Sequence, residues 1–502
     1  MSQISLSRNI LLGYASQIYV TVIALVTVPW FLKYLGREAY GLIGFHSMLQ
    51  MWFQLLDVGL TPTISRETAR FRGGAIDAIS LQTLLRALEG IFVCIAVVGA
   101  LSIFAGAGIL ASRWLQPGSL SVEEAHHSIQ LMGIIVALRW ICGLYRGVIS
   151  GFERLAWLGG INILLATARF VLPVPFLILV SARPSSFFAF QLGVAIVEVL
   201  ILAVPAYRLL PKVESVRLAF LHWQPVRTVL RFSTGIALTS SIWIVVTQTD
   251  KLLLSKFLPL AEYSQFSIAV LLANGILVAT APIGAALLPR LTKLSAEGND
   301  AGFLRLYRDG TQLVGVLAIP TAVVLALFAA PVLSAWTGDL ELARRAAPVL
   351  TLYALGNGIL AVATLPYYLQ FAKGSLKWHV IGSVIFILIL LPGIVWGVSR
   401  YGPSGAGYAW LAMNAAFLVL WIPFVHHRIL GSVQVRWFVD LLVISAVTVS
   451  TLALARRLPL WDLGRAQQIG GIVLVSLGAL VVAAFAAPAV RCRVFKSPNA
   501  LQ

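Results

Sequence analysis

Runs of about twenty apolar residues, separated by short polar segments, recur along the whole sequence. A helix needs about twenty apolar residues to cross the hydrocarbon core of a membrane, so each run predicts one span. The predicted spans are 9–32, 40–62, 81–110, 128–149, 158–180, 187–206, 232–256, 263–288, 311–334, 348–370, 379–399, 405–425, 439–456 and 467–488. The pattern therefore predicts an all-α polytopic membrane protein with about fourteen transmembrane helices.

The first and seventh predicted spans share a register that indicates an internal repeat. Arg8 and Arg231 open these two spans, and Tyr40 and Tyr263 each follow the next short turn, both pairs 223 positions apart. This offset crosses six spans, an even number, so the two copies have the same orientation in the membrane. Such parallel repeats are typical of transporters built from two bundles around an axis along the membrane normal.

Composition and charge agree with a membrane protein. Of the 502 residues 59% are hydrophobic and 11% are charged, and the mean hydropathy is +0.91, which no soluble globular domain resembles. The net charge of +18 reflects basic residues in the loops of one side, as the positive-inside rule expects. The charge therefore predicts cytoplasmic termini and requires no nucleic-acid partner. Cys94, Cys142 and Cys492 form no evident disulfide framework.

Motifs of catalytic domains are missing from the sequence. It has no Walker loop, no zincin helix and no Gly-x-Ser-x-Gly elbow. The predicted loops are too short to form a soluble catalytic domain, and the histidines show no compelling metal-site spacing. The sequence thus predicts a protein that is not an enzyme and that has neither a cofactor nor a metal site.

The most unusual segment is the apolar stretch 133–176, because it contains Arg139, Arg146 and Arg169. A guanidinium stays charged, and near mid-bilayer it costs about 2.5–3.5 kcal/mol or more. Such residues must face the bundle interior or a water-filled cavity. Arg139 and Arg146 are two helical turns apart and share one helix face. We therefore expect these arginines to bind something long and anionic.

A polar stripe on the second predicted span adds candidates for the same cavity. His46, Gln50, Gln54 and Asp57 fall on one face of a helix. The seventh span adds Thr247, with Lys251 one turn beyond. Polar faces on spans one, two and seven suggest a shared central cavity where the halves meet, whereas the alternative interpretation is hydrogen bonding between helices.

Four carboxylates in or beside the spans are candidates for ion coupling: Asp57, Glu89, Glu198 and Asp250. A carboxyl in apolar surroundings has a raised pKa and can load a proton. The alternative for each is structural pairing with an arginine. Arg86 is expected to pair with Glu89, three residues away, or to meet an anionic headgroup. Asp250 and Lys251 are adjacent, so we expect them not to face each other.

The sequence resembles the Wzx-type polysaccharide flippases in two segments. The first contains Leu35-Gly36-Arg37-Glu38, then Tyr40-Gly41, then Asp57-Val58-Gly59-Leu60. The second contains Gln248-Thr249-Asp250-Lys251, followed by Glu262-Tyr263. Wzx-type flippases belong to the multidrug/oligosaccharidyl-lipid/polysaccharide exporter superfamily, which also holds drug antiporters and the peptidoglycan-precursor flippase.

This resemblance implies two pseudo-symmetric six-helix lobes around a central cavity, with two additional C-terminal helices. The corresponding parts would be a lobe at 1–206, an amphipathic cytoplasmic connector at 207–231, a lobe at 232–425, and two helices with a basic cytoplasmic tail at 426–502. The implied activity is movement of polyprenyl-diphosphate-linked oligosaccharide from the inner to the outer leaflet of the bacterial cytoplasmic (inner) membrane. It would work by alternating access, supplying surface polysaccharides such as the O-antigen of lipopolysaccharide, with a polysaccharide polymerase as a candidate partner.

The predicted substrate site comprises Arg139, Arg146, Arg169, Arg86, Lys251, Gln50 and Gln54. An alternative is an ion-coupled multidrug antiporter of the same superfamily, which predicts a cavity dominated by acids. A membrane polysaccharide polymerase or ligase is a further alternative, but such enzymes usually carry their chemistry on a large outer loop.

Overall fold

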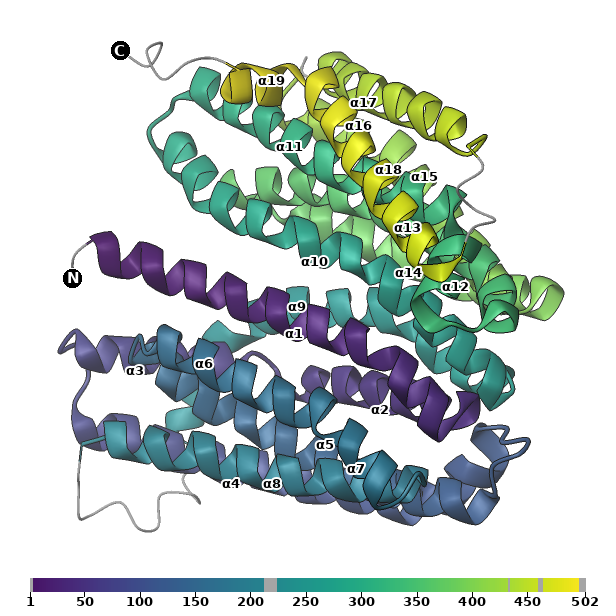
Figure 1. Cartoon of the computed structure of the whole chain (residues 1–502). Helices are drawn as coiled ribbons and strands as arrows, with labels where there is room; N and C mark the ends of the chain where they lie inside the picture. The colour runs from purple at the N-terminus through teal and green to yellow at the C-terminus, as the bar shows by residue number, and fades with distance from the viewer. Residues whose placement is uncertain (1–2, 212–223, 432–433, 459–463, 496–502) are drawn as a thin grey trace. The chain divides into compact units, whose positions relative to one another are not determined.

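The computed structural model of the chain describes residues 3–211, 224–431, 434–458 and 464–495 (Figure 1). Side chains are described for residues 12–211, 241–431, 435–458 and 464–491. Within these ranges the regular structure is helical, without a β-sheet. In the described part of the chain, twelve helices are long and apolar enough to cross a membrane. The predicted helical, multi-pass membrane protein is thus confirmed.

The count of about fourteen spans is not established by the structure. The second predicted span, 40–62, is broken into three pieces. The seventh, 232–256, begins in a part of its helix whose side chains lie outside the described residues. The middle of the predicted amphipathic connector, residues 212–223, lies outside the described residues altogether.

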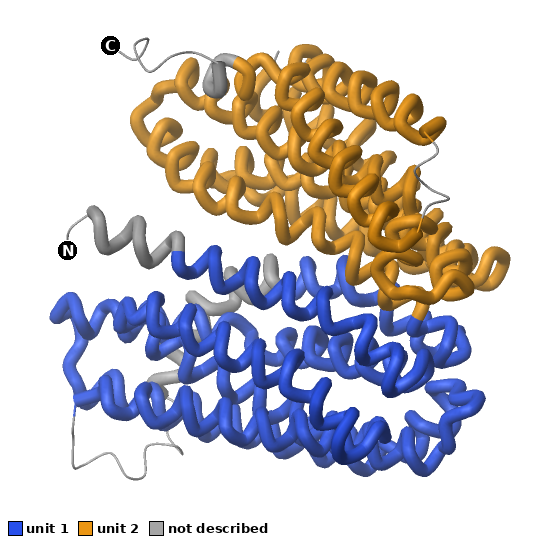
Figure 2. Tube along the Cα trace, viewed as in Figure 1, with its two compact units in different colours: residues 1–264 blue, residues 265–502 orange. Residues whose placement is uncertain are grey.

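The chain divides into two compact units, residues 1–264 and 265–502 (Figure 2). Most of the first unit is built from long helices with three breaks. The helices and turns are α1 (Gln3–Leu35), α2 (Arg37–Phe53), the 3₁₀ turn η1 (Gln54–Asp57), α3 (Leu60–Arg72), α4 (Ala78–Ile109), the π turn η2 (Leu110–Trp114), α5 (Val122–Gly151), α6 (Leu155–Ala166), the π turn η3 (Thr167–Val171), α7 (Pro173–Leu179), α8 (Pro184–Leu209) and α9 (Gln224–Phe257).

In the first unit α5 is the central helix, in contact with α3, α4 and α8. Its apolar face joins a core in which Phe92 of α4 stacks on Trp140, with ring centroids 4.3 Å apart. The same helix carries Gly143, Gly147 and Gly151 at intervals of four. A side chain at Gly147 would meet the backbone carbonyl of Thr61. Small residues in membrane helices allow such close approach, so this stripe holds α3 directly against α5.

The second unit follows with α10 (Leu260–Ala296), which begins at the end of the first unit. It continues with α11 (Asp300–Leu327), α12 (Ala329–Thr337), α13 (Leu340–Ala372), α14 (Lys377–Tyr401), α15 (Pro403–Ala416), the π turn η5 (Phe417–Trp421), α16 (Ile422–Ile429), α17 (Gln434–Ala455), α18 (Arg465–Ala486) and α19 (Pro488–Phe495).

Helix α11 is central in the second unit and contacts α13, α17 and α18. The fully buried Trp437 of α17 donates a hydrogen bond to the hydroxyl of Thr311 at 2.9 Å. Arg308 of α11 pairs with Asp440 of α17. Both α17 and α18 are apolar enough to cross a membrane, and these polar contacts attach α17 to α11.

Candidate functional site

The second predicted span is broken just where its polar residues lie. After Asp57 the backbone turns through Val58 (φ 45°) and Gly59 (φ 73°) before α3 begins. A β-branched residue with positive φ is strained and rare. Asp57 stabilises the break, because its Oδ1 accepts hydrogen bonds from the Thr61 hydroxyl at 2.7 Å and the Thr61 amide at 3.1 Å. Irregular backbone within a membrane is tolerated where it is buried in protein or lines a cavity.

A second irregularity positions Arg169. This residue lies in the π turn η3, and Pro173 follows at the start of α7. Single π turns interrupt the regular helical hydrogen bonds and are frequent at functional sites. The carbonyl of Arg169 accepts a hydrogen bond from Gln191 Nε2 on α8 at 2.7 Å. The turn is therefore held in place by a side chain of a neighbouring helix.

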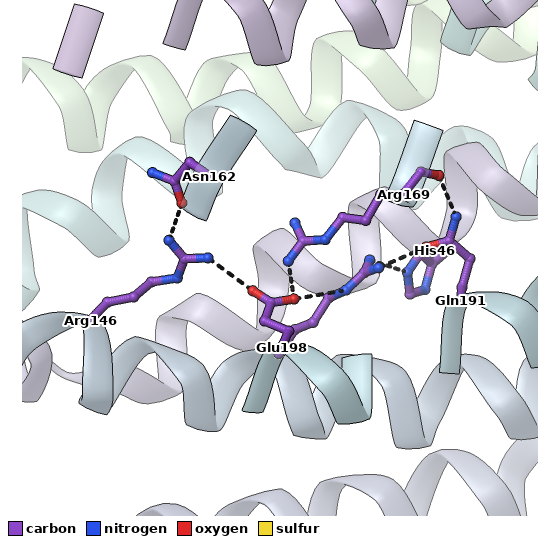
Figure 3. Close-up of polar contacts among 7 residues, drawn as sticks. His46, Arg146, Asn162, Arg169, Gln191 and Glu198 are labelled. Carbon is purple, nitrogen blue, oxygen red and sulfur yellow. Dashed lines mark hydrogen bonds and ion pairs between the residues drawn. The ribbon is translucent and has the colours of Figure 1, made fainter. Parts of the chain in front are cut away.

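The three predicted arginines converge on one carboxylate, that of Glu198 on α8 (Figure 3). Arg146 Nη2 lies 2.9 Å from Oε1, Arg139 Nε lies 3.8 Å from Oε2, and Arg169 Nη2 donates a hydrogen bond to Oε2. The Glu198 side chain is 2% exposed, whereas those of Arg139, Arg169 and Arg146 are 13%, 24% and 29% exposed. The cluster therefore has three cations and one buried anion. The guanidiniums form its solvent-accessible side.

Neutral side chains orient the same guanidiniums. Arg139 Nη2 donates to Gln191 Oε1 at 2.8 Å, and Arg139 Nη1 lies 3.5 Å from His46 Nε2. Arg146 donates to the Asn162 side-chain oxygen. Gln191 thus links two arginines, one through its oxygen and the other through its nitrogen. The neutral side chains therefore orient the guanidiniums of Arg139 and Arg146 without offsetting their charge.

Several buried N–H groups around this cluster have no hydrogen-bond acceptor among the described residues. They are Arg139 Nε, Arg169 Nε, Gln50 Nε2 and Trp140 Nε1. Buried polar groups without partners are rare because each costs free energy. All four groups are donors, and all four residues line one cavity. This arrangement suits a ligand rich in hydrogen-bond acceptors.

The cavity lies within the first unit and has a volume of about 560 Å³. Its walls come from α1, α2, η1, α3, α5, α6, η3, α8 and Ile244 of α9. The predicted site residues Arg139, Arg146, Arg169, Gln50 and Gln54 all line it, as do the ion-coupling candidates Asp57 and Glu198. The polar lining also includes Ser16, Gln17 and Asn162.

Some predicted residues are not among those that line this cavity: Arg86, Glu89, Asp250, Lys251, His46 and Thr247. Arg86 pairs with Glu89 at 3.2 Å, one of the alternatives foreseen. The Glu89 carboxylate also accepts hydrogen bonds from the hydroxyls of Tyr145 and Tyr207, which favours a structural role. Lys251 Nζ lies 3.4 Å from Asp250 Oδ1, so the expectation that these neighbours do not face each other was wrong. The long lysine side chain bends back along its helix.

Sequence reasoning missed Asn162, which lines the cavity, and Gln191, which holds Arg139 and the carbonyl of Arg169. One signal was available, because Gln191 and Glu198 are seven residues apart, like Arg139 and Arg146. Two such faces on adjacent helices predict a polar seam between them. No signal in the sequence announced the π turn around Arg169. Among the described residues, no group of three histidine, cysteine or acidic side chains could hold a metal ion.

Comparison with solved structures shows the fold class. The chain is similar to a lipid II flippase MurJ in an inward closed conformation, with a TM-score of 0.71 and 13% identity. The match covers 93% of this chain and 98% of that chain. It is also similar to an inward-facing multidrug resistance MATE family transporter of the MOP superfamily, with a TM-score of 0.62 and 14% identity. That match covers 84% of this chain and 98% of the other.

Sequence comparison finds two relatives that carry the same name. A protein of Shigella flexneri, named "Putative O-antigen transporter", is 22% identical over 418 residues, which are 82% of this chain and 95% of that protein. A protein of the same name from Salmonella typhi is 22% identical over 258 residues, which are 51% of this chain and 58% of that protein.

The family described as "Polysaccharide biosynthesis protein" matches residues 6–295. This match covers more than half of the chain and includes every cavity-lining residue. The family, the relatives and the fold together identify a membrane transport protein rather than an enzyme. The chain belongs to the polysaccharide biosynthesis protein family.

Proposed function

We propose that this protein is a flippase for polyprenyl-diphosphate-linked oligosaccharide. It moves this lipid from the inner to the outer leaflet of a bacterial cytoplasmic membrane, where the glycan enters a surface polysaccharide such as O-antigen. The polysaccharide family and the names of the relatives support this substrate class. The excess of basic residues in the predicted inner loops supports cytoplasmic termini.

The observation that carries the proposal is the arginine cluster in the cavity. Arg139, Arg146 and Arg169 outnumber Glu198, and buried N–H groups around them have no acceptor within the described ranges. Arginine pairs with phosphate oxygens through several parallel hydrogen bonds, and these charge-assisted bonds are strong. A diphosphate offers many acceptor oxygens and negative charge in a small volume. It therefore matches both the charge and the donor groups of the cavity.

The dimensions of the cavity are also compatible with such a headgroup. Pockets of about 300–1,000 Å³ enclose ligands of drug size, and the volume here is about 560 Å³. A diphosphate with its first sugar is a group of this size. Gln50 and Gln54 provide amide groups, and Trp140 provides an indole N–H, for contacts with hydroxyl groups of a sugar.

Two irregular backbone segments provide places for movement between inward-open and outward-open states. The break at Val58 and Gly59, and the π turn around Arg169, both lie in elements that line the cavity. Backbone changes in transporters concentrate at such element ends. Of the four candidates for ion coupling, Asp57 and Glu198 are the two that line the cavity. We also propose that the transporter has two lobes, residues 1–206 and 232–425.

Export of cationic drugs is the second candidate function, because Asp57 and Glu198 lie in the cavity. The charges favour the flippase, however. Three permanent cations in the wall repel a cationic drug, and Glu198 is 2% exposed behind them. The two functions therefore predict opposite effects when one arginine is removed.

The test replaces Arg169 with Ala and with Lys in cells that lack their own flippase. We expect Arg169→Ala to abolish export and to leave lipid-linked oligosaccharide in the inner leaflet. Arg169→Lys should retain part of the activity, since it keeps the charge but loses the paired N–H groups. Arg72→Ala is the matched control, because Arg72 forms an exposed ion pair with Glu153 in the same unit. Full export by Arg169→Ala at normal protein level contradicts the proposal.

A further inference from the structure

We propose that Glu198 is a positioning residue that acts as a built-in counter-ion. It holds the three guanidiniums together while the cavity is empty, and it yields them in part to the anionic group of the substrate. This inference rests on the proposed function. It assigns a role in binding and release to a carboxylate that acts through the arginines around it.

Glu198 lines the cavity but is more deeply buried than the three arginines around it. Both of its oxygens are engaged by arginines, Oε1 by Arg146 and Oε2 by Arg139 and Arg169. Its side chain is 2% exposed, and each arginine side chain is several times more accessible. Figure 3 shows the carboxylate between Arg146 and Arg169, on the helix side of the cluster. Glu198 also lines the cavity, but a ligand there meets the more exposed guanidiniums first.

The charges explain why such a group is needed. Three guanidiniums within reach of one carboxylate repel one another, and this repulsion is strong where little water screens it. Glu198 offsets part of that repulsion in the empty state. The cluster keeps an excess of two positive charges, and a diphosphate diester carries one negative charge on each phosphate group. Glu198 thus adjusts the cluster to the charge of the ligand.

The same carboxylate also promotes release. If Glu198 were neutral, three uncompensated cations would hold a diphosphate more tightly. The free energy of the bound state would then be lower, and the barrier to the change between inward-open and outward-open states would be higher. A ligand that is held too tightly is transported slowly, because only binding that differs between states drives the cycle. Glu198 competes with the ligand for the same N–H groups. It recovers the guanidiniums as the diphosphate leaves.

The surrounding contacts allow the charge to be changed without removing the framework. Gln191 fixes Arg139, and Asn162 fixes Arg146, each through a neutral oxygen. Glu198→Gln keeps the shape and one acceptor oxygen but removes the negative charge. Asn162→Asp makes the opposite change, because it keeps the acceptor for Arg146 and adds a negative charge. The pair of variants separates an effect of charge from an effect of packing.

The experiment uses the full chain in lipid nanodiscs and measures binding of farnesyl diphosphate by calorimetry, with farnesyl monophosphate for comparison. Transport is measured in proteoliposomes with a polyprenyl-diphosphate-linked sugar. We expect Glu198→Gln to bind farnesyl diphosphate about ten-fold more tightly and to transport about ten-fold more slowly. Asn162→Asp should bind it about ten-fold more weakly. Glu67→Gln is the matched control, because Glu67 is also buried and accepts from Arg66 and Arg70 but is not among the residues that line the cavity.

The outcomes separate this inference from the proposed function. If the wild-type protein does not bind farnesyl diphosphate, the proposed function fails, and the inference fails with it. If the wild type binds but Glu198→Gln binds equally or more weakly, only the role of Glu198 is overturned. Should Glu198→Gln not fold, Asn162→Asp decides, since wild-type affinity in that variant overturns the inference by itself. Tighter binding with unchanged transport contradicts the role in release.

Discussion

Two buried clusters, one in each unit, use the same side-chain chemistry in different proportions. In the second unit, Arg308 donates to both oxygens of Asp440, from Nε at 2.5 Å and from Nη2 at 2.8 Å. Gln312 Nε2 donates to Asp440 at 2.8 Å, and Gln312 Oε1 accepts from the amide of Ala489 at 2.8 Å. In this part of the described chain, none of the buried polar side-chain atoms of these residues lacks a partner.

The cluster in the first unit is different in both charge and hydrogen bonding. Three arginines share Glu198, and the Nε atoms of Arg139 and Arg169 have no acceptor among the described residues. A cluster in which every group is paired has nothing left to bind, and its role is to attach α17 and α19 to α11. A cluster with extra cations and unpaired donors is costly unless something else completes it. The comparison teaches that an excess of positive charge and of unpaired N–H donors, more than burial, distinguishes the functional cluster.

The largest expected effect comes from removing that imbalance. Arg146→Glu changes the cluster from three cations and one anion to two of each. We expect transport to fall at least about 100-fold, because the excess charge that attracts a diphosphate is gone. Transport of a polyprenyl-diphosphate-linked sugar in proteoliposomes measures this effect. Activity within a few-fold of the wild type would mean that the excess charge is irrelevant.

The second prediction concerns the balanced cluster. Asp440→Ala leaves Arg308 and Gln312 without their acceptor in a partly buried site. We expect a loss of about 2–3 kcal/mol in the free energy of unfolding, less than for a fully buried pair because Arg308 is partly exposed. Thermal unfolding in detergent measures the loss. Transport per folded molecule should stay at the wild-type level, and a selective loss of transport would contradict a purely structural role.

A smaller effect is expected from Gln191→Leu. This change removes the link between Arg139 and the carbonyl of Arg169 while leaving all charges in place. One buried hydrogen-bonding side chain is worth about 1–3 kcal/mol when its partners stay unsatisfied. We therefore expect weaker binding of farnesyl diphosphate, by about ten-fold, together with a lower melting temperature. Unchanged binding would show that the charges alone, without their orientation, define the site.

The smallest effect concerns a carboxylate that is held by backbone amides. Glu38 accepts hydrogen bonds from the backbone amides of Ser119 and Leu120 at 2.8 Å and of Gly118 at 3.2 Å. Burial raises the pKa of Glu38, but the hydrogen bonds from Ser119, Leu120 and Gly118 outweigh this and lower it overall. Its stabilising contribution is therefore fully present above the ordinary pKa of glutamate and is lost as the pH falls through the lowered pKa.

Glu38→Gln should remove this pH dependence at a cost of less than about 1 kcal/mol, since the site is partly exposed to solvent. Melting temperatures of the wild type and the variant between neutral and acidic pH measure it. We expect the two curves to differ at neutral pH and to converge in acid. Curves that stay parallel over the whole range would exclude a role for the charge of Glu38.

Much of the fold could be predicted from the sequence, because membrane spans depend on the length and polarity of local segments. The shared face of Arg139 and Arg146 followed from helical spacing, and both side chains do reach one carboxylate. The break at Val58 could not be predicted from hydrophobic periodicity. It depends on the capping of α3 by Asp57 and on the close approach of α3 to the glycines of α5, which are tertiary contacts.

The residues that pair with the arginines were harder to predict from the sequence than the arginines themselves. Glu198 was recognised as an unusual carboxylate, but the sequence could not decide between ion coupling and pairing with arginine. Gln191 and Asn162 carry no charge, so nothing in their residue type distinguished them from polar groups that hydrogen-bond between helices. Lys251 shows the opposite error, because spacing along a helix ignores how far a long side chain can bend back.

The most direct measurement is a structure of the full chain bound to a polyprenyl-diphosphate-linked sugar. The account predicts that the phosphate oxygens lie within hydrogen-bonding distance of the side chains of Arg146 and Arg169, with Glu198 behind them. It would be contradicted by a diphosphate bound elsewhere in the protein while the three arginines stay paired with Glu198 as they are without ligand.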